Sequence, residues 1–226
     1  MGITSLVMGA TGLVGQEVTQ QLLASDNVEE VRILVRREPD YKHPKLNVIL
    51  IDWDELPRYK KAFEGVDQVF SCLGTTIKKA GSQEAFRKVD EEYVLSGAAL
   101  ALESGVPQFL AVSSMGASRS SKAFYSRVKG EVEEALSHLP FQGVHLFRPS
   151  LLLGDRSERR LGEDVASVVM RRLDFLFRGK LAPYRAVPAS KVARAMVNIS
   201  FSQTRGTHVY PNDVIHVLGD DTMQEQ

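Results

Sequence analysis

The sequence predicts an α/β fold in which helices cover both faces of a doubly wound parallel sheet. Short apolar runs alternate with longer stretches of helical periodicity over the first 150 residues, and this alternation favours parallel strands that are joined by helices. The apolar runs are rich in Val, Ile and Leu and lack polar alternation, which is typical of strands buried on both faces. A length of 226 residues suits a single domain of this class.

Six strands and four helices are expected in the first 150 residues. The expected strands span residues 3–8, 31–35, 48–51, 66–72, 108–113 and 144–147. The expected helices span residues 15–24, 54–63, 82–103 and 122–139, and the last of them ends before Pro140.

The regular alternation of strands and helices ends after Pro149. We therefore expect one domain, residues 1–226, with a core of residues 1–150, an extension of residues 151–219 and a polar tail of residues 220–226. Helices are expected in the extension at 163–177 and 190–201, and strands at 207–210 and 214–217. The extension is too small for a core of its own, so we expect it to pack on the C-terminal edge of the sheet and cover a substrate.

Composition excludes several classes of protein. Lys plus Arg and Asp plus Glu both number 28, whereas nucleic-acid binders usually carry a basic excess, so no nucleic-acid partner is expected. A single cysteine excludes an internal disulfide, and the five histidines have no metal-ligand spacing, so no metal is expected. No apolar run reaches the length of a membrane span. We expect a cytoplasmic protein.

A glycine-rich segment lies between the first strand and the first helix. In this position glycines permit a tight turn, close approach of a pyrophosphate and close helix packing, while the helix N-terminus attracts phosphate. This context predicts a dinucleotide site on a Rossmann-type sheet, although the first glycine gap is one residue longer than in the usual motif. The segment consists of Gly9, Ala10, Thr11, Gly12, Leu13, Val14 and Gly15.

The end of the second strand favours NADPH over NADH. An NAD site usually has an acidic residue about 20 positions after the glycines, but this chain has Arg36 and Arg37 there. A guanidinium suits a 2′-phosphate. The alternative is that both arginines are solvated loop charges, with Glu38 neutralising one of them.

Other cofactor neighbours are expected at the ends of later strands. We expect Asp52 and Trp53 beside the adenine, and the segment after the fourth strand beside the pyrophosphate and the nicotinamide ribose. That segment and the remaining expected contacts are Cys72, Leu73, Gly74, Thr75, Thr76, Lys129 and Arg148.

A catalytic group is expected on the helix at 122–139. Tyr125 and Lys129 are four residues apart and therefore share a helix face. A nearby ammonium stabilises a phenolate, so Tyr125 can exchange a proton with a carbonyl oxygen. Ser114 or Ser113, at the end of the fifth strand, can hold that oxygen with its hydroxyl. The alternative for Tyr125 is an ordinary half-buried helix tyrosine.

These motifs together resemble the short-chain dehydrogenase/reductase superfamily, in its extended or atypical branch. The similarity is closest to the Tat-interacting-protein-like oxidoreductases and covers nearly the whole chain. It rests on the glycine segment and on Cys72 to Thr76, Val89-Asp90-x-x-Tyr93-Val94, Ser113-Ser114-x-Gly116-Ala117, Tyr125-x-x-x-Lys129 to Glu133, Phe147-Arg148-Pro149, Asp155-Arg156 and Gly162-Glu163.

The resemblance implies a Rossmann fold, NADPH binding and Tyr125 with Lys129 as the catalytic pair. Two features depart from the superfamily pattern. The gap from Ser114 to Tyr125 is 11 residues, or 12 from Ser113, which is short. The position that is commonly asparagine is Asp90 here, which puts the usual proton relay in question.

Two functions follow as hypotheses. The first is an NADPH-dependent oxidoreductase that reduces a small-molecule carbonyl, with Tyr125 as the proton donor. The second is an NADPH-sensing regulator that binds a protein partner and turns over little. An epimerase or dehydratase is disfavoured, because such enzymes usually carry larger substrate domains than the 76 residues after position 150. The sequence leaves open a homodimer or a protein partner.

Overall fold

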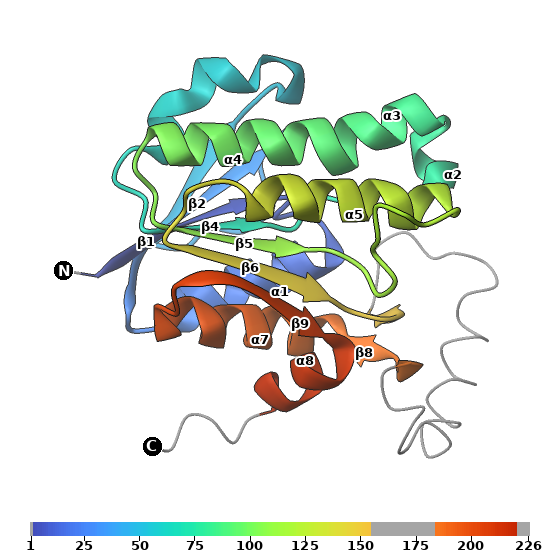
Figure 1. Ribbon diagram of the computed structural model, residues 1–226. Helices are drawn as coiled ribbons and strands as arrows, with labels where there is room; N and C mark the ends of the chain where they lie inside the picture. Colours follow the sequence, from blue (N-terminus) through green and yellow to red (C-terminus); the bar gives the residue numbers. More distant parts are fainter. Residues whose placement is uncertain (1, 155–183, 221–226) are drawn as a thin grey trace.

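The computed structural model describes residues 2–154 and 184–220. Within these residues, seven parallel strands form one sheet in the order β3-β2-β1-β4-β5-β6-β9 (Figure 1). The strands are β1 (Ile3–Met8), β2 (Val28–Val35), β3 (Leu46–Leu50), β4 (Gln68–Ser71), β5 (Gln108–Val112), β6 (Gly143–Arg148) and β9 (Gly206–Pro211). The strand order reverses between β1 and β4, and ligands of open α/β sheets bind at the carboxyl ends of strands at such a point. The predicted fold class is confirmed.

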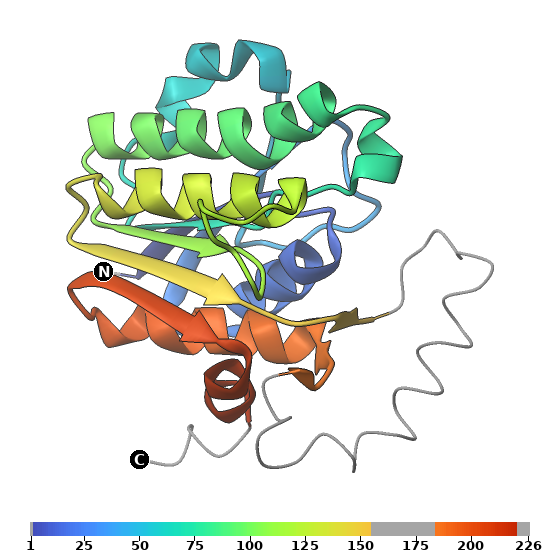
Figure 2. The same cartoon turned by 45° about the vertical axis from the view of Figure 1, so that its right-hand side comes forward.

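Helices cover both faces of the sheet (Figures 1 and 2). One face carries the 3₁₀ helix η1 (Trp53–Phe63), α3 (Gln83–Arg87), the π-helical turn η2 (Lys88–Glu92), α4 (Tyr93–Glu103) and α5 (Phe124–Ser137). The opposite face carries α1 (Leu13–Ala24) and α7 (Ala189–Ser202), which pack against each other.

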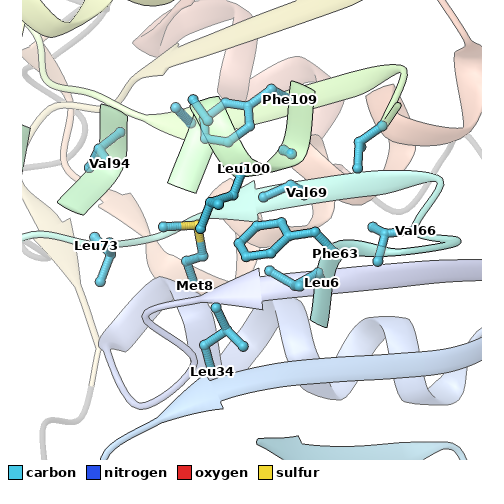
Figure 3. Close-up of a cluster of buried hydrophobic side chains, with 14 of the residues drawn as sticks. Leu6, Met8, Leu34, Phe63, Val66, Val69, Leu73, Val94, Leu100 and Phe109 are labelled. Carbon is cyan, nitrogen blue, oxygen red and sulfur yellow. The ribbon is translucent and has the colours of Figure 1, made fainter. Parts of the chain in front are cut away.

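The alternation of side chains along β1 builds a core on each face of the sheet. Leu6 and Met8 point into the cluster under α4 and η1, where they meet Phe63 and Leu100 (Figure 3). Val7, between them, belongs to the cluster under α1 and α7. Because both faces are buried, the strands need no polar alternation, as the sequence indicated.

The C-terminal part of the chain differs from expectation in one element. The expected strand at 214–217 is wrong, because these residues lie in helix α8 (Asn212–Leu218). Ile215 is buried while Val214 and Val217 are exposed, a helical burial pattern that a short apolar run does not reveal. The strand at 207–210 is confirmed as part of β9, which pairs with β6 and completes the sheet.

Three further elements complete the described chain. Helix α2 (Ile77–Ala80) was not expected, and β7 (Leu152–Leu153) pairs with β8 (Val187–Pro188) in a separate two-stranded ladder. The expected helix at 163–177 lies outside the described residues, and the covering of a substrate by the extension stays a prediction. In the parts of the chain that the structure describes, every helix is too short or too polar to cross a bilayer.

Candidate active site

A cavity of about 440 Å³ opens at the carboxyl ends of β1, β4 and β5. Its wall combines the glycine segment, the segment after β4, the end of β5 and one face of α5. The lining residues are Thr11, Gly12, Leu13, Val14, Gln16, Cys72, Leu73, Gly74, Thr75, Thr76, Lys79, Asp90, Val112, Ser113, Tyr125, Lys129 and Leu152. The strand reversal therefore brings together most of the residues that the sequence singled out.

Two glycines shape the turn from β1 into α1. Gly9 has a φ of +80°, and a Cβ there would lie 2.7 Å from the carbonyl carbon of Cys72. A Cβ on Gly15 would lie 2.1 Å from the Gly9 oxygen. Both neighbours are backbone atoms, so only glycine fits either position without moving the chain. These contacts press the start of α1 against the ends of β1 and β4.

The N-terminus of α1 faces the cavity without a cap. Gly12 is the N-cap residue and no side chain caps the helix, while Leu13 and Val14 line the cavity in its first turn. The first amides of a helix have no partner within the helix, and they carry a partial positive charge. This end of the cavity therefore suits a phosphate group.

The opposite side of the cavity carries the expected catalytic residues. Ser113, Tyr125 and Lys129 all line it. The Ser113 hydroxyl is buried and has no hydrogen-bond partner among the described residues, whereas the Ser114 hydroxyl donates to the Met115 carbonyl oxygen at 3.3 Å and Ser114 does not line the cavity. The Tyr125 ring packs on buried Phe86 at 5.6 Å between centroids.

Lys129 has an acidic partner inside the site. Its ammonium lies 2.8 Å from Asp90 Oδ1, and the two side chains are 6% and 1% exposed. The other oxygen, Asp90 Oδ2, accepts the Thr75 backbone N–H at 2.8 Å. The position that departs from the superfamily pattern therefore lies in direct contact with the expected catalytic lysine.

The other expected cofactor contacts lie around the rim of the cavity. Met8 pairs with Leu34, so exposed Arg36 and Arg37 leave β2 at the same edge of the sheet as the glycine segment. Asp52 accepts the Asp54 N–H at 3.0 Å, and Trp53 stacks on Tyr93 at 5.6 Å. None of these four expected residues lines the cavity itself.

Arg148 and Cys72 differ in their relation to the cavity. Arg148 does not line it, because its guanidinium holds the Glu133 carboxylate through two hydrogen bonds from Nε, at 2.9 and 3.2 Å, and one from the terminal nitrogen at 2.5 Å. Cys72 lines the cavity, and burial raises the pKa of its thiol to about 12. A protonated thiol is a poor nucleophile, so Cys72 serves as part of the wall.

Sequence reasoning missed four lining residues. Gln16 and Lys79 add polar groups, and Val112 and Leu152 add apolar surface. Gln16 follows the last glycine directly, so helical geometry could have placed it near the segment. Leu152 belongs to the small β7–β8 ladder, for which the sequence carried no signal. The described residues contain no group of three or more His, Cys, Asp or Glu side chains that could hold a metal ion.

Comparisons with known proteins agree with this geometry. The sequence profile of the NAD(P)H-binding family matches residues 9–139. Protein HTATIP2 of Rattus norvegicus is 36% identical over 220 residues, which cover 96% of this chain and 89% of the relative. The mitochondrial protein FMP52 of Candida albicans is 33% identical over 230 residues, covering 98% and 97% of the two chains.

Solved structures share the fold at lower identity. MoeE5 in complex with UDP-glucuronic acid and NAD has a TM-score of 0.71 and 17% identity, over 92% of this chain and 76% of that one. The predicted resemblance to Tat-interacting-protein-like oxidoreductases is confirmed by the match to HTATIP2. The chain therefore belongs to the NAD(P)H-binding family of Rossmann-fold, oxidoreductase-like proteins and is a homologue of Protein HTATIP2.

Proposed function

We propose that this protein is an NADPH-dependent oxidoreductase that reduces the carbonyl group of a small molecule. One observation carries the proposal: the uncapped N-terminus of α1 and the side chains of Ser113, Tyr125 and Lys129 line the same cavity. An end that suits phosphate and a side chain that can donate a proton, in one cavity, suit the reduction of a carbonyl by a nicotinamide cofactor.

The residues of the cavity fit a dinucleotide. The amides at the start of α1 would hold the pyrophosphate, and the segment from Leu73 to Thr76 would run beside the nicotinamide ribose. Lys129 would donate to the ribose hydroxyls. When bound, the reduced cofactor supplies a hydride.

Chemistry at the substrate uses the hydroxyls of two residues. The carbonyl oxygen would accept hydrogen bonds from Ser113 and Tyr125, which would leave its carbon open to the hydride that a bound cofactor supplies. Tyr125 then gives its phenolic proton to the oxygen, which completes an alcohol, and the phenolate regains a proton from solvent. Ser113 takes this role ahead of Ser114, because only its hydroxyl is buried in the cavity without a partner among the described residues.

Substitution of Tyr125 tests this chemistry. Tyr125→Phe keeps the ring on Phe86 but removes the proton donor, so turnover falls by at least ~100-fold while the affinity for NADPH stays unchanged. Tyr41→Phe is a matched control, because Tyr41 and Lys45 repeat the Tyr-x-x-x-Lys spacing in a loop away from the cavity. Undiminished activity of Tyr125→Phe on a validated carbonyl would refute the role.

The preference for NADPH over NADH is a separate part of the proposal. Arg36 and Arg37 are exposed where β2 leaves the sheet, and a guanidinium pairs well with a phosphate. Calorimetry with both nucleotides should give tighter binding of NADPH, and Arg36→Ala with Arg37→Ala should remove the difference. Exposed Arg58, in η1, provides a control as Arg58→Ala. Equal affinity of the wild type for both nucleotides would contradict the preference.

The ion pair between Asp90 and Lys129 supports a second candidate function. A lysine engaged by a carboxylate at 2.8 Å suits a protein that binds NADPH as a signal and has little turnover. A panel of carbonyl compounds separates the two candidates. Oxidation of NADPH well above background with any compound would rule out the sensor.

The compartment is also a proposal. A single cysteine suits a reducing compartment, and we propose the cytoplasm, although the name of the relative FMP52 places that protein in mitochondria. Fractionation of cells that express the tagged chain would decide between the two compartments.

A further inference from the structure

Asp90 occupies an unusual position in the helix that covers the cavity. The expected helix at 82–103 is interrupted by the π-helical turn η2, and Asp90 lies in that turn with 1% of its side chain exposed. Such turns often mark functional sites. Asp90 also lines the cavity, so the interruption delivers a buried carboxylate to the expected active site.

The carboxylate joins two walls of the cavity. Oδ1 forms an ion pair with the Lys129 ammonium of α5 at 2.8 Å and has no partner with hydrogen-bond geometry among the described residues, whereas Oδ2 accepts the Thr75 N–H of the segment after β4 at 2.8 Å. Gly74 leaves this junction open, since a Cβ there would lie 3.5 Å from Asp90 Oδ1 and 4.0 Å from the Lys129 nitrogen. A ligand that enters the cavity therefore meets the pair without an intervening side chain.

A carboxylate suits both contacts, whereas an amide of the same size does not. Asparagine has one acceptor oxygen and one NH₂ donor group. If its oxygen faced the Thr75 N–H, its NH₂ would face the Lys129 ammonium, donor against donor. If it turned over, the NH₂ would face the Thr75 N–H. In either orientation the ammonium also loses its counter-charge in a buried place, which is costly.

We propose that Asp90 is a positioning residue that fixes the Lys129 ammonium and the Thr75 backbone for the cofactor. This inference rests on the proposed function, because it assumes that the cavity holds the nicotinamide end of NADPH. Asp90 acts through Lys129: the carboxylate fixes where the ammonium stands, and the ammonium meets the ribose. A group that sets the geometry of a site in advance lowers the cost of binding.

Substitution at Asp90 tests the inference through cofactor affinity. In Asp90→Asn the Lys129 ammonium is no longer held in place for the ribose. Calorimetry should therefore show NADPH binding weakened roughly 10- to 100-fold, which is the effect of losing one hydrogen bond that involves a charged group. The KM for NADPH should rise by a similar factor. A residue that only supported the fold would lower the folded fraction and leave the affinity of the folded protein unchanged. Binding is therefore measured below the unfolding temperature that circular dichroism gives for each variant.

A matched control lies one residue away. Glu91 is in the same π-helical turn but pairs with Arg87, outside the cavity. Glu91→Gln should leave NADPH affinity within about twofold of the wild type, as expected for a partly exposed pair. Equal losses of NADPH affinity in Asp90→Asn and Glu91→Gln would overturn the inference, because damage to the π-helical turn alone would then explain both results.

A double substitution tests whether Asp90 acts through Lys129. Lys129→Met should weaken NADPH binding, and adding Asp90→Asn should weaken it no further, because the ammonium is gone and the asparagine oxygen can still accept the Thr75 N–H. If Asp90→Asn lowered the affinity for NADPH by the same factor in the wild type and in Lys129→Met, the result would contradict the inference. Each single variant leaves one buried charge without its partner, whereas the double variant leaves none. If a single variant does not fold, the double variant is compared with the wild type, and an unchanged NADPH affinity there would contradict the inference.

Two failures are distinguishable. A wild type that binds neither NADPH nor NADH contradicts the proposed function and, with it, the inference. A wild type that binds NADPH, together with an Asp90→Asn variant of unchanged affinity and KM, contradicts the inference alone.

Discussion

Gly15 gives a sharp prediction about the glycine segment. A Cβ at this position would lie 2.1 Å from the Gly9 oxygen and 2.8 Å from the Gly9 carbon. A close carbon–oxygen contact is normally about 3.3 Å, so Gly15→Ala must separate α1 from the turn by roughly 1 Å. The atoms in conflict are backbone, and rotation of a side chain cannot relieve them.

The effect on stability follows from two opposed terms. Replacing glycine by alanine inside a helix normally stabilises it by about 1 kcal/mol. Overpacking costs about 1–3 kcal/mol, and a clash between backbone atoms belongs at the upper end of that range. We therefore expect Gly15→Ala to lose up to about 2 kcal/mol of unfolding free energy, measured by urea denaturation.

Cofactor affinity should fall more steeply than stability in Gly15→Ala. A displacement of about 1 Å in a positioned group can cost on the order of 100-fold in reaction rate. The turn carries the amides that would hold the pyrophosphate, so we expect a marked loss of NADPH affinity as well. Gly97→Ala is the control, because its Cβ would lie 2.2 Å from Met8 Cε, an equally close contact that involves side-chain and not backbone atoms. It should keep NADPH affinity. A Gly15→Ala variant with full stability and full NADPH affinity would show that the turn accepts a Cβ without moving α1.

Three further predictions concern single side chains. Ser113→Ala should reduce carbonyl turnover by at least ~10-fold, whereas Ser114→Ala should leave it near the wild-type value; the opposite ranking in steady-state assays would reassign the serine. Burial and then His208 lower the pKa of His145 from 6.5 to about 4. The unfolded chain therefore binds a proton at this residue at a higher pH than the folded protein does. Above pH 6.5 His145 does not lower the free energy of unfolding, and between pH 6.5 and pH 4 it lowers this free energy by up to about 3 kcal/mol. Urea titrations should show a smaller fall in His145→Gln, and an identical fall would contradict the assignment. Burial raises the pKa of the Cys72 thiol to about 12, although the residue keeps some exposed surface in the cavity wall. A maleimide at pH 8 should therefore label the native protein slowly and the urea-unfolded chain quickly, and equal rates would contradict the raised pKa.

The sequence predicted the sheet because its strands are short apolar runs that alternate with longer helical stretches. The six expected strands of the first 150 residues all occur, and the glycine segment lies between β1 and α1 as expected. Residues 214–217 show where this reasoning fails, since four apolar-rich residues suit a strand as well as a helix turn. Only their burial, with Ile215 inside and Val217 outside, separates the two.

The site was predictable in its parts but not in its contacts. The spacing of Tyr125 and Lys129 placed both on one helix face, and the structure brings them to the cavity. Which serine faces that cavity depends on the last residues of β5, where strand alternation ends. The contact of Asp90 with Lys129 depends on a π-helical turn, which periodicity does not predict.

Arg148 shows the same limit in another form. Its expected role at the cofactor came from a motif, yet its guanidinium engages Glu133, which lies 15 residues earlier on α5. The packing of β6 beside α5 brings Arg148 and Glu133 together, and no local pattern in the sequence predicts this contact.

The proposed function requires that a nicotinamide dinucleotide bind across the cavity with its diphosphate on the N-terminus of α1. A crystal structure of the protein with NADPH tests it most directly. We expect diphosphate oxygens within hydrogen-bond distance of the Leu13 and Val14 amides, and the nicotinamide ring beside Tyr125. A nucleotide bound at another surface, or a diphosphate away from these amides, would contradict it.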